Sequence, residues 1–175
     1  MKKIIFPLLS VSLLMLACNT DKKEDTNDKK DDISAMESKQ ERNKKIIMAS
    51  MENFSKGDYD AAFKDAAPGF IDYADGSMPP MTSIDSLKSF VRMMTAAVTG
   101  YKGENLNYYA DDDHVIVIGD WTGTFKNDLM GIKATGKPVK FRDADIFKLN
   151  EEGKITEHSS VQNIGASLMT AGMMK

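Results

Sequence analysis

The sequence is poor in the residues that build disulfides, metal centres and thiol or imidazole active sites. Its 175 residues include one cysteine, two histidines and one tryptophan. A single cysteine cannot form an intramolecular disulfide, so the folded part must be stable without one. The sequence has no zinc-site spacing, no glycine-rich phosphate loop and no nucleophile motif. These absences predict a protein without a metal ion or other cofactor.

Basic charge is also scarce. The formal net charge is −3, and removing Lys2 and Lys3 with a cleaved leader lowers it further to −5. No stretch resembles the basic surface that binds nucleic acid. We therefore expect no nucleic-acid partner.

The amino terminus predicts export to the bacterial cell envelope. Two lysines precede an apolar stretch at residues 4–17 that is too short to span a bilayer comfortably and is typical of a signal-peptide core. The letters LMLAC, which end at Cys18, resemble a bacterial lipobox, in which the cysteine is lipidated and becomes the first residue. We interpret residues 1–17 as a lipoprotein signal peptide and Cys18 as the lipidation site, which anchors the protein in the outer membrane, with the cell surface as an open alternative. An uncleaved anchor with an incidental thiol is the other interpretation.

The segment that follows, residues 18–33, is rich in acidic residues and lysine. It has almost no large apolar side chains to bury, so it cannot offset the entropy lost on ordering. We predict a disordered tether here and a single folded domain at residues 34–175, which is an ordinary length for one domain.

The first half of this domain carries helical patterns. Ser34 and Glu37 form a capping box at the start of a first helix, whose beginning projects and whose end docks before Gly57. Asp58 is the predicted N-cap of a second helix, which ends at Pro68-Gly69. A third helix is expected over about residues 84–98.

Beyond Gly100 the hydrophobic period changes to two. Four antiparallel strands are expected, with the longest near residues 114–125 and 138–149, and a short strand precedes the third helix. Helices followed by an antiparallel meander indicate an α+β fold. The predicted architecture is three N-terminal helices packed on a strongly curved antiparallel sheet that forms a cone with an internal pocket.

Several segments resemble the SnoaL-like polyketide (ester) cyclases, a branch of the nuclear transport factor 2-like superfamily. The matching pieces, in order, are GDYDAAF at 57–63, TGT at 122–124, LMGIKATGK at 129–137, DIFKL at 145–149 and GKITEH at 153–158. The resemblance covers about residues 40–163. It implies a cone-shaped α+β fold with a deep pocket, often in homodimers that pack sheet against sheet.

The same resemblance implies an acid/base position that this sequence lacks. Members of the family continue GKI-E-H with a tryptophan and, four residues later, an aspartate that serves as general acid/base. Here those positions hold Ser159 and Asn163. Strict alternation predicts that both face the pocket and that His158 faces away from it. Because an amide takes up no proton near neutral pH, this departure weighs against cyclase chemistry.

Two aspartates of the expected strand 138–149 are the alternative acid/base candidates. Asp143 and Asp145 alternate with apolar residues, while lysine and arginine occupy the opposite, solvated face. Their positions would be about 7 Å apart, and two carboxyl groups that close in an apolar cavity push one pKa upward. Aspartates that only accept structural hydrogen bonds are the alternative, which the sequence alone favours.

Aromatic residues from the helices, the short strand and the sheet are expected to line the pocket together with Ser159 and Asn163: Phe54, Tyr59, Phe63, Phe70, Tyr73, Trp121, Phe141 and Phe147. The favoured function is a lipid-anchored module that binds a small apolar or amphipathic molecule without turnover. The alternative is a small acid/base enzyme of the cyclase, isomerase or hydratase type that uses Asp143 or Asp145. The expected partners are a small-molecule ligand, the membrane through Cys18, and a second copy of the chain through the sheet.

Overall fold

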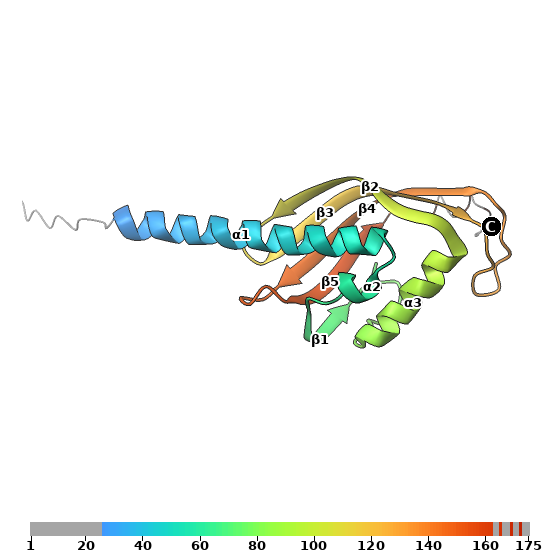
Figure 1. The fold of residues 1–175 in the computed structure, drawn as a ribbon, viewed down its shortest axis with the longest axis horizontal. Helices are drawn as coiled ribbons and strands as arrows, with labels where there is room; N and C mark the ends of the chain where they lie inside the picture. Colours follow the sequence, from blue (N-terminus) through green and yellow to red (C-terminus); the bar gives the residue numbers. More distant parts are fainter. Residues whose placement is uncertain (1–25, 163–164, 166–168, 170–171, 173–175) are drawn as a thin grey trace, which may run out of the picture.

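The computed structural model describes residues 26–162 together with residues 165, 169 and 172. These residues form helices and strands in the following order: α1 (Thr26–Ser55), α2 (Tyr59–Ala62), β1 (Ala66–Asp72), α3 (Ile84–Ala97), β2 (Val98–Ala110), β3 (His114–Phe125), β4 (Pro138–Leu149) and β5 (Ile155–Gln162). Figure 1 shows the helices gathered on one side of a curved sheet. The predicted α+β fold is confirmed.

The sheet has five strands in the order β1-β5-β4-β3-β2. Strands β2 to β5 form the antiparallel meander that the sequence predicts. The sheet is nevertheless mixed, because β1 adds to the β5 edge in parallel. The expectation of a wholly antiparallel sheet is therefore wrong at this edge. Parallel neighbours need a crossover, and here α3 with the meander supplies it.

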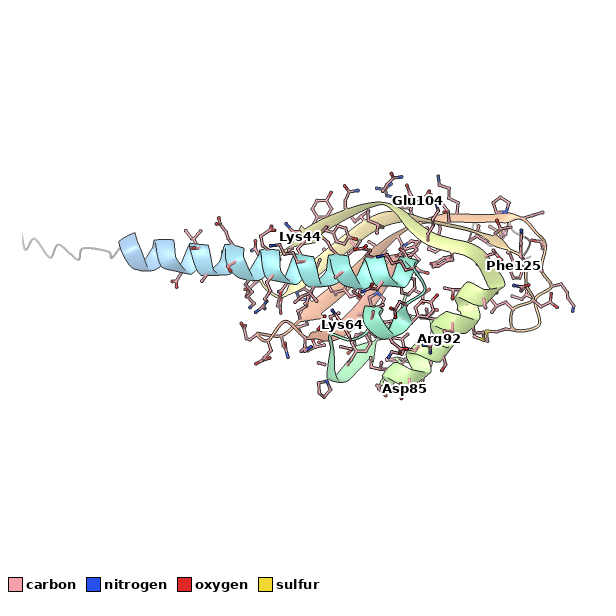
Figure 2. All side chains as sticks on the ribbon, viewed as in Figure 1. Lys44, Lys64, Asp85, Arg92, Glu104 and Phe125 are labelled. Carbon is pink, nitrogen blue, oxygen red and sulfur yellow. The ribbon has the colours of Figure 1, made fainter. Side chains whose placement is uncertain are left out.

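Helix α1 begins at Thr26, well before the capping box at Ser34. The prediction of a disordered tether is therefore wrong for residues 26–33, where neither proline nor glycine interrupts the helix. Residues 1–25, including Cys18, lie outside the described part of the chain. The side chains at positions 32–38 are exposed, and Figures 1 and 2 show this end of α1 extending beyond the sheet. The other end docks on the sheet as predicted.

The second predicted helix is shorter than expected. Asp58 does cap α2 and accepts a hydrogen bond from the Ala61 amide at 3.0 Å, but α2 has only four residues. Pro68 and Gly69, expected to end it, lie within β1. Proline is tolerated there because β1 is an edge strand. Helix α3 starts after its N-cap Ser83 and leads directly into β2.

Strands β3 and β4 have the bounds that the alternation predicts. Strand β2 starts at Val98, directly after α3, and is one residue longer than either of them. The core lies between the inner face of the sheet and the helices. The most completely buried side chains are Ile47, Val115, Val117, Phe125, Leu149 and Asn43. Gly119 permits a close approach: a Cβ at this position would lie 2.3 Å from Leu106 Cδ2.

Within the described part of the chain, no helix is long and apolar enough to cross a membrane.

Candidate functional site

A cavity of about 330 Å³ lies between the inner face of the sheet and the helices. This is within the range of small-molecule sites. Apolar side chains, many of them aromatic or methionine, form most of its wall, and Asp, His, Ser and Gln side chains enter it from β1, β4 and β5. Methionine side chains adapt readily to irregular apolar shapes. The cavity therefore has an apolar body and one polar region.

Six of the aromatic residues expected in the pocket line this cavity: Phe54, Phe63, Phe70, Trp121, Phe141 and Phe147. The other two are placed elsewhere. Tyr59 is buried against α3, where its hydroxyl lies 2.7 Å from Thr95 Oγ1. Tyr73 is 38% exposed and does not line the cavity.

Asp143 and Asp145 both line the cavity, and both are buried, at 4% and 8% exposed. One oxygen of each is engaged. Gln162 Nε2 donates to Asp143 Oδ2 at 2.9 Å, and His158 Nε2 lies 3.3 Å from Asp145 Oδ1. The other oxygens, Asp143 Oδ1 and Asp145 Oδ2, have no hydrogen-bond partner among the described residues. Buried polar atoms without a partner are rare in folded proteins, and these two oxygens are free to accept hydrogen bonds from a bound molecule.

His158 lies between two carboxylates inside the cavity, contrary to the prediction that it faces away. Its Nδ1 is 3.2 Å from Asp72 Oδ1, and its Nε2 is 3.3 Å from Asp145 Oδ1. Carboxylates only accept hydrogen bonds, so both ring nitrogens must donate for the arrangement to be satisfied. The charged imidazolium is the form that fits. The ring also lies against Phe147, with ring centroids 4.7 Å apart.

A bulge in β5 explains this error. The pairing of β4 with β5 shifts between Leu149–Ile155 and Lys148–Glu157, which leaves Thr156 as an extra residue. A bulge residue reverses the alternation for the rest of the strand. The residues of β5 that reach the cavity after the bulge are His158, Ser160 and Gln162.

The bulge also changes the position of Ser159, one of the two pocket residues predicted on this strand. Ser159 does not line the cavity, whereas its neighbours on both sides do. Asn163 lies outside the described residues. Sequence alternation found Asp143 and Asp145 because β4 pairs with β3 without interruption. It missed Asp72, although Asp72 lies two residues after Phe70, a spacing that places both on one face of a strand.

The electrostatics of the site are unusual. Burial raises the pKa of Asp143 to about 7, the charge of Asp145 adds to this, and the hydrogen bond from Gln162 opposes it. Burial alone lowers the pKa of His158, but the hydrogen bonds and charges of Asp145 and Asp72 outweigh it and raise the pKa to about 10. Near neutral pH, His158 is therefore a fixed cation and Asp143 exchanges its proton.

Trp121 supplies the third unpartnered polar atom of the cavity. Its ring stacks on Tyr101 with centroids 5.2 Å apart and meets the edge of Phe54. The residue is 4% exposed, and its Nε1–H has no acceptor among the described residues. Buried indole N–H groups usually have a partner. Trp121 can therefore donate to an oxygen of a bound molecule.

Within the described residues, no group of three or more histidine, cysteine or acidic side chains is arranged to hold a metal ion.

A family model of SnoaL-like polyketide cyclases matches residues 45–169. The chain belongs to this family. No curated protein matches the sequence.

Solved structures of SnoaL-like and NTF2-like proteins share the fold. A candidate SnoaL-like polyketide cyclase from Jannaschia sp. superposes with a TM-score of 0.68 and 20% identity, covering 76% of this chain and 92% of that chain. AclR from Streptomyces galilaeus gives 0.67 and 20%, covering 78% and 88%. An NTF2-like protein from Burkholderia thailandensis gives 0.63 and 21%, covering 76% and 98%. At these identities the likeness concerns the fold.

Proposed function

We propose that this SnoaL-like protein is an acid/base enzyme that moves a proton on a small, largely apolar molecule, with Asp143 as the proton carrier. One observation supports this most strongly: a carboxyl group whose pKa is about 7 lies in an apolar cavity with one oxygen unpartnered among the described residues. A general acid/base works best when its pKa is close to the working pH. The sequence alone favoured binding without turnover. The environment of Asp143 leads us to favour an enzyme instead.

The three neighbouring groups have supporting roles in this proposal. His158 stays protonated between Asp72 and Asp145, so it holds these carboxylates in place and does not exchange its proton near neutral pH. Asp145 contributes the charge that raises the pKa of Asp143. Gln162 fixes the orientation of the Asp143 carboxyl group. Asp143 is left as the group that can both take and return a proton.

The reaction class that suits these groups is proton removal beside a carbonyl. Asp143 Oδ1 takes a proton from the carbon next to the carbonyl, and the electron pair of that C–H bond forms the C=C bond of an enolate. The negative charge moves to the carbonyl oxygen, which a donor such as Trp121 Nε1–H stabilises. Return of the proton to another carbon gives an isomerase. Attack of the enolate carbon on a second carbonyl gives a cyclase.

Deuterium exchange into 2-tetralone, an apolar ketone that enolises, tests this proposal. In D₂O buffer, the wild-type protein should accelerate exchange at the carbon beside the carbonyl, with a rate that rises through pH 7 as Asp143 loses its proton. Asp143→Asn should lose the acceleration. Asp120→Asn, which removes a carboxylate that pairs with Arg142 across β3 and β4, should keep it. No acceleration over buffer by the wild-type protein would overturn the enzymatic proposal.

Binding without turnover is the second candidate function. It is favoured by Asn163, which stands where the family resemblance implies the acid/base aspartate, and by the apolar wall of the cavity. The same ketone distinguishes the two candidates. A protein that only binds would shift the NMR signals of cavity residues on addition of 2-tetralone but would leave the rate of exchange unchanged.

We also propose that the protein works in the cell envelope, anchored through Cys18. The support is the sequence of residues 1–18, and the projecting end of α1 would hold the domain away from the membrane. Cys18→Ser should abolish incorporation of a labelled fatty acid and release the protein from the membrane fraction. Retained label, or unchanged fractionation, would contradict the proposal.

A homodimer through the sheet is the proposed assembly. The face of the sheet turned away from the cavity carries exposed apolar residues on three strands, namely Tyr109, Ile116 and Val161. Strand register places Tyr109 beside Ile116, and Ile116 beside Ile146. An Ile116→Glu substitution should convert a dimer to a monomer in light-scattering measurements. A wild-type protein that is monomeric at high concentration would contradict the assembly.

A further inference from the structure

The cavity carries a marked excess of acidic groups. Four carboxyl groups line it, from Asp72, Asp75, Asp143 and Asp145, and one imidazole, from His158. No lysine or arginine of the described residues lines it. Asp75 lies toward solvent, where hydrogen bonds from Ser77 lower its pKa and keep it charged. The polar region is therefore negative even when Asp143 is protonated.

His158, the single cationic side chain among the described residues that line the cavity, has both ring nitrogens paired with carboxylates. Both nitrogens of His158 face carboxylate oxygens, of Asp72 and of Asp145, so neither can bind an anionic ligand. Among the described residues, the buried side-chain atoms without a partner are two carboxyl oxygens and one indole N–H. Two of these three atoms accept hydrogen bonds from a ligand when the carboxyl groups are ionised.

We infer that the site selects molecules whose polar end is uncharged or positively charged, and that it excludes carboxylates of the same size and shape. This inference rests on the proposed binding of a small molecule in the cavity, and it adds the chemical class of that molecule. The aromatic wall is compatible with it, because the faces of Phe, Tyr and Trp rings attract cations and accept neutral groups. Neutral hydroxy ketones and amines with an apolar body belong to this class.

The expected size of the discrimination follows from Coulomb's law. Two like charges several ångströms apart repel strongly enough, at the effective dielectric constant of a protein interior, to weaken binding by roughly tenfold or more. Solvent does not screen this repulsion well, because Asp143 and Asp145 are both buried. A carboxylate ligand would also leave the acceptor oxygens of these residues without a donor.

Three probes with one apolar body test the inference: 2-naphthylmethanol, 2-naphthylmethylamine and 2-naphthoate. Their dissociation constants are measured for the wild-type protein at pH 7.5 by isothermal titration calorimetry. The alcohol and the ammonium compound should bind, and 2-naphthoate should bind at least tenfold more weakly than the alcohol. Equal or tighter binding of 2-naphthoate would overturn the inference and leave the proposed binding site intact.

A variant locates the effect in the cavity. Asp143→Asn removes one of the charges and should narrow the difference between alcohol and carboxylate at least threefold. Asp120→Asn removes the same charge from the outer face of the sheet and should leave the difference unchanged. An equal change in both variants would overturn the assignment to the cavity. Failure of all three probes to bind the wild-type protein would overturn both the inference and the binding site, whereas failed deuterium exchange with the predicted ranking would overturn only the enzymatic proposal.

Discussion

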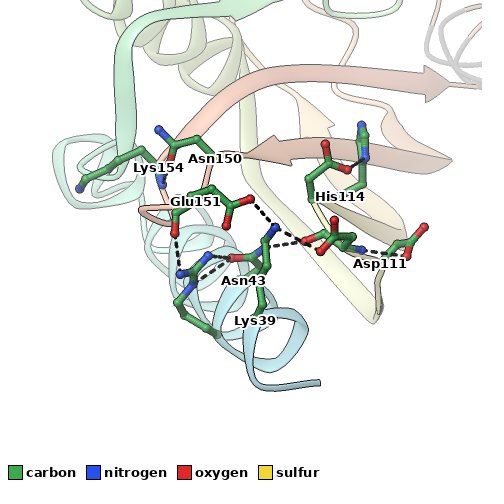
Figure 3. Close-up of polar contacts among 10 residues, drawn as sticks. Lys39, Asn43, Asp111, His114, Asn150, Glu151 and Lys154 are labelled. Carbon is green, nitrogen blue, oxygen red and sulfur yellow. Dashed lines mark hydrogen bonds and ion pairs between the residues drawn. The ribbon is translucent and has the colours of Figure 1, made fainter. Parts of the chain in front are cut away.

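Two polar clusters of this protein use similar side chains in different ways. The first, called here the base cluster, joins α1 to the turns that precede β3 and β5, and Figure 3 shows it. Lys39 Nζ binds Glu151 Oε1 at 2.8 Å and Asp112 Oδ1 at 3.1 Å. Arg42 donates to the Glu151 carbonyl at 2.8 Å and to the side chain of Asn43. Its two cations balance its two carboxylates.

The second, called here the pocket cluster, consists of Asp72, Asp143, Asp145, His158 and Gln162. Its three carboxyl groups face one cation, and two of its oxygens have no partner among the described residues. The carboxylates of the base cluster are largely exposed, whereas those of the pocket cluster are buried.

The difference is the one expected between a structural cluster and the proposed site of proton transfer. An exposed, charge-balanced cluster fixes the position of α1 on the sheet. A buried cluster with excess negative charge costs stability, and it shifts a pKa toward neutrality, which is what proton transfer needs. Changes in the pocket cluster should therefore have larger and more pH-dependent effects than changes in the base cluster.

The largest effect is expected for His158→Phe. The aromatic ring can keep its packing against Phe147, but Asp72 and Asp145 lose the cation between them. Removing one partner of a buried ion pair typically costs about 3–5 kcal/mol of the free energy of unfolding. Urea unfolding at pH 7 measures this loss.

The pH dependence provides a control for this prediction. The pKa of His158 is about 10 in the folded protein and about 6.5 when unfolded. Its stabilising contribution is therefore complete below pH 6.5 and is lost between pH 6.5 and 10. The difference between wild type and His158→Phe should shrink across this window. A constant difference would show that the loss comes from packing alone.

Asp143→Asn should stabilise the protein at high pH. The pKa of Asp143 is about 7 in the folded protein and about 3.8 in the unfolded chain, so the wild-type protein loses stability as pH rises from about 4 to 7. Asparagine can still accept the hydrogen bond from Gln162 but carries no charge. We expect a gain of about 1–3 kcal/mol at pH 8 and little change at pH 4, measured by urea unfolding at both values. A loss of stability at pH 8 would contradict the account.

Asn43→Ala tests the stability that the base cluster contributes through its buried residue. Asn43 is fully buried, and its amide accepts from Arg42 and lies 3.4 Å from the Asp112 carbonyl. Losing this bridge should cost about 1–2 kcal/mol of the free energy of unfolding. The loss should be the same at pH 5 and pH 8, because an amide does not titrate. A strong pH dependence would contradict a purely structural role.

The smallest effect is expected for Lys39→Met. Its ion pairs to Asp112 and Glu151 lie at the surface, where water and salt screen them. No measurable change in the urea midpoint is expected. A change as large as that of His158→Phe would remove the distinction between the two clusters.

The sequence predicts the uninterrupted parts of this structure well. Strands β3 and β4 pair without a bulge, so simple alternation gave both their bounds and the inward direction of Asp143 and Asp145. The family resemblance also named the fold correctly. Patterns repeated over a dozen residues are robust to local irregularity.

The errors arose where a single residue or a distant pairing decides the geometry. The extra residue Thr156 reversed the faces of β5, which moved His158 into the cavity and Ser159 out of it. The parallel pairing of β1 brings Asp72 beside His158 from far along the sequence. No local pattern contains that contact. Of the pocket cluster, the sequence therefore predicted only Asp143 and Asp145, which β4 contributes.

The most direct test of the central claim is an NMR titration of the Asp143 carboxyl carbon. The account predicts an apparent pKa of about 7 in the wild-type protein, because burial and the charge of Asp145 disfavour the ionised form. The signal is assigned through its loss in Asp143→Asn, and Asp120 on the outer face serves as a reference group in the same spectra. A pKa near 4 for Asp143 would mean that the carboxyl group is solvated, and it would contradict the proposal that this residue carries the proton.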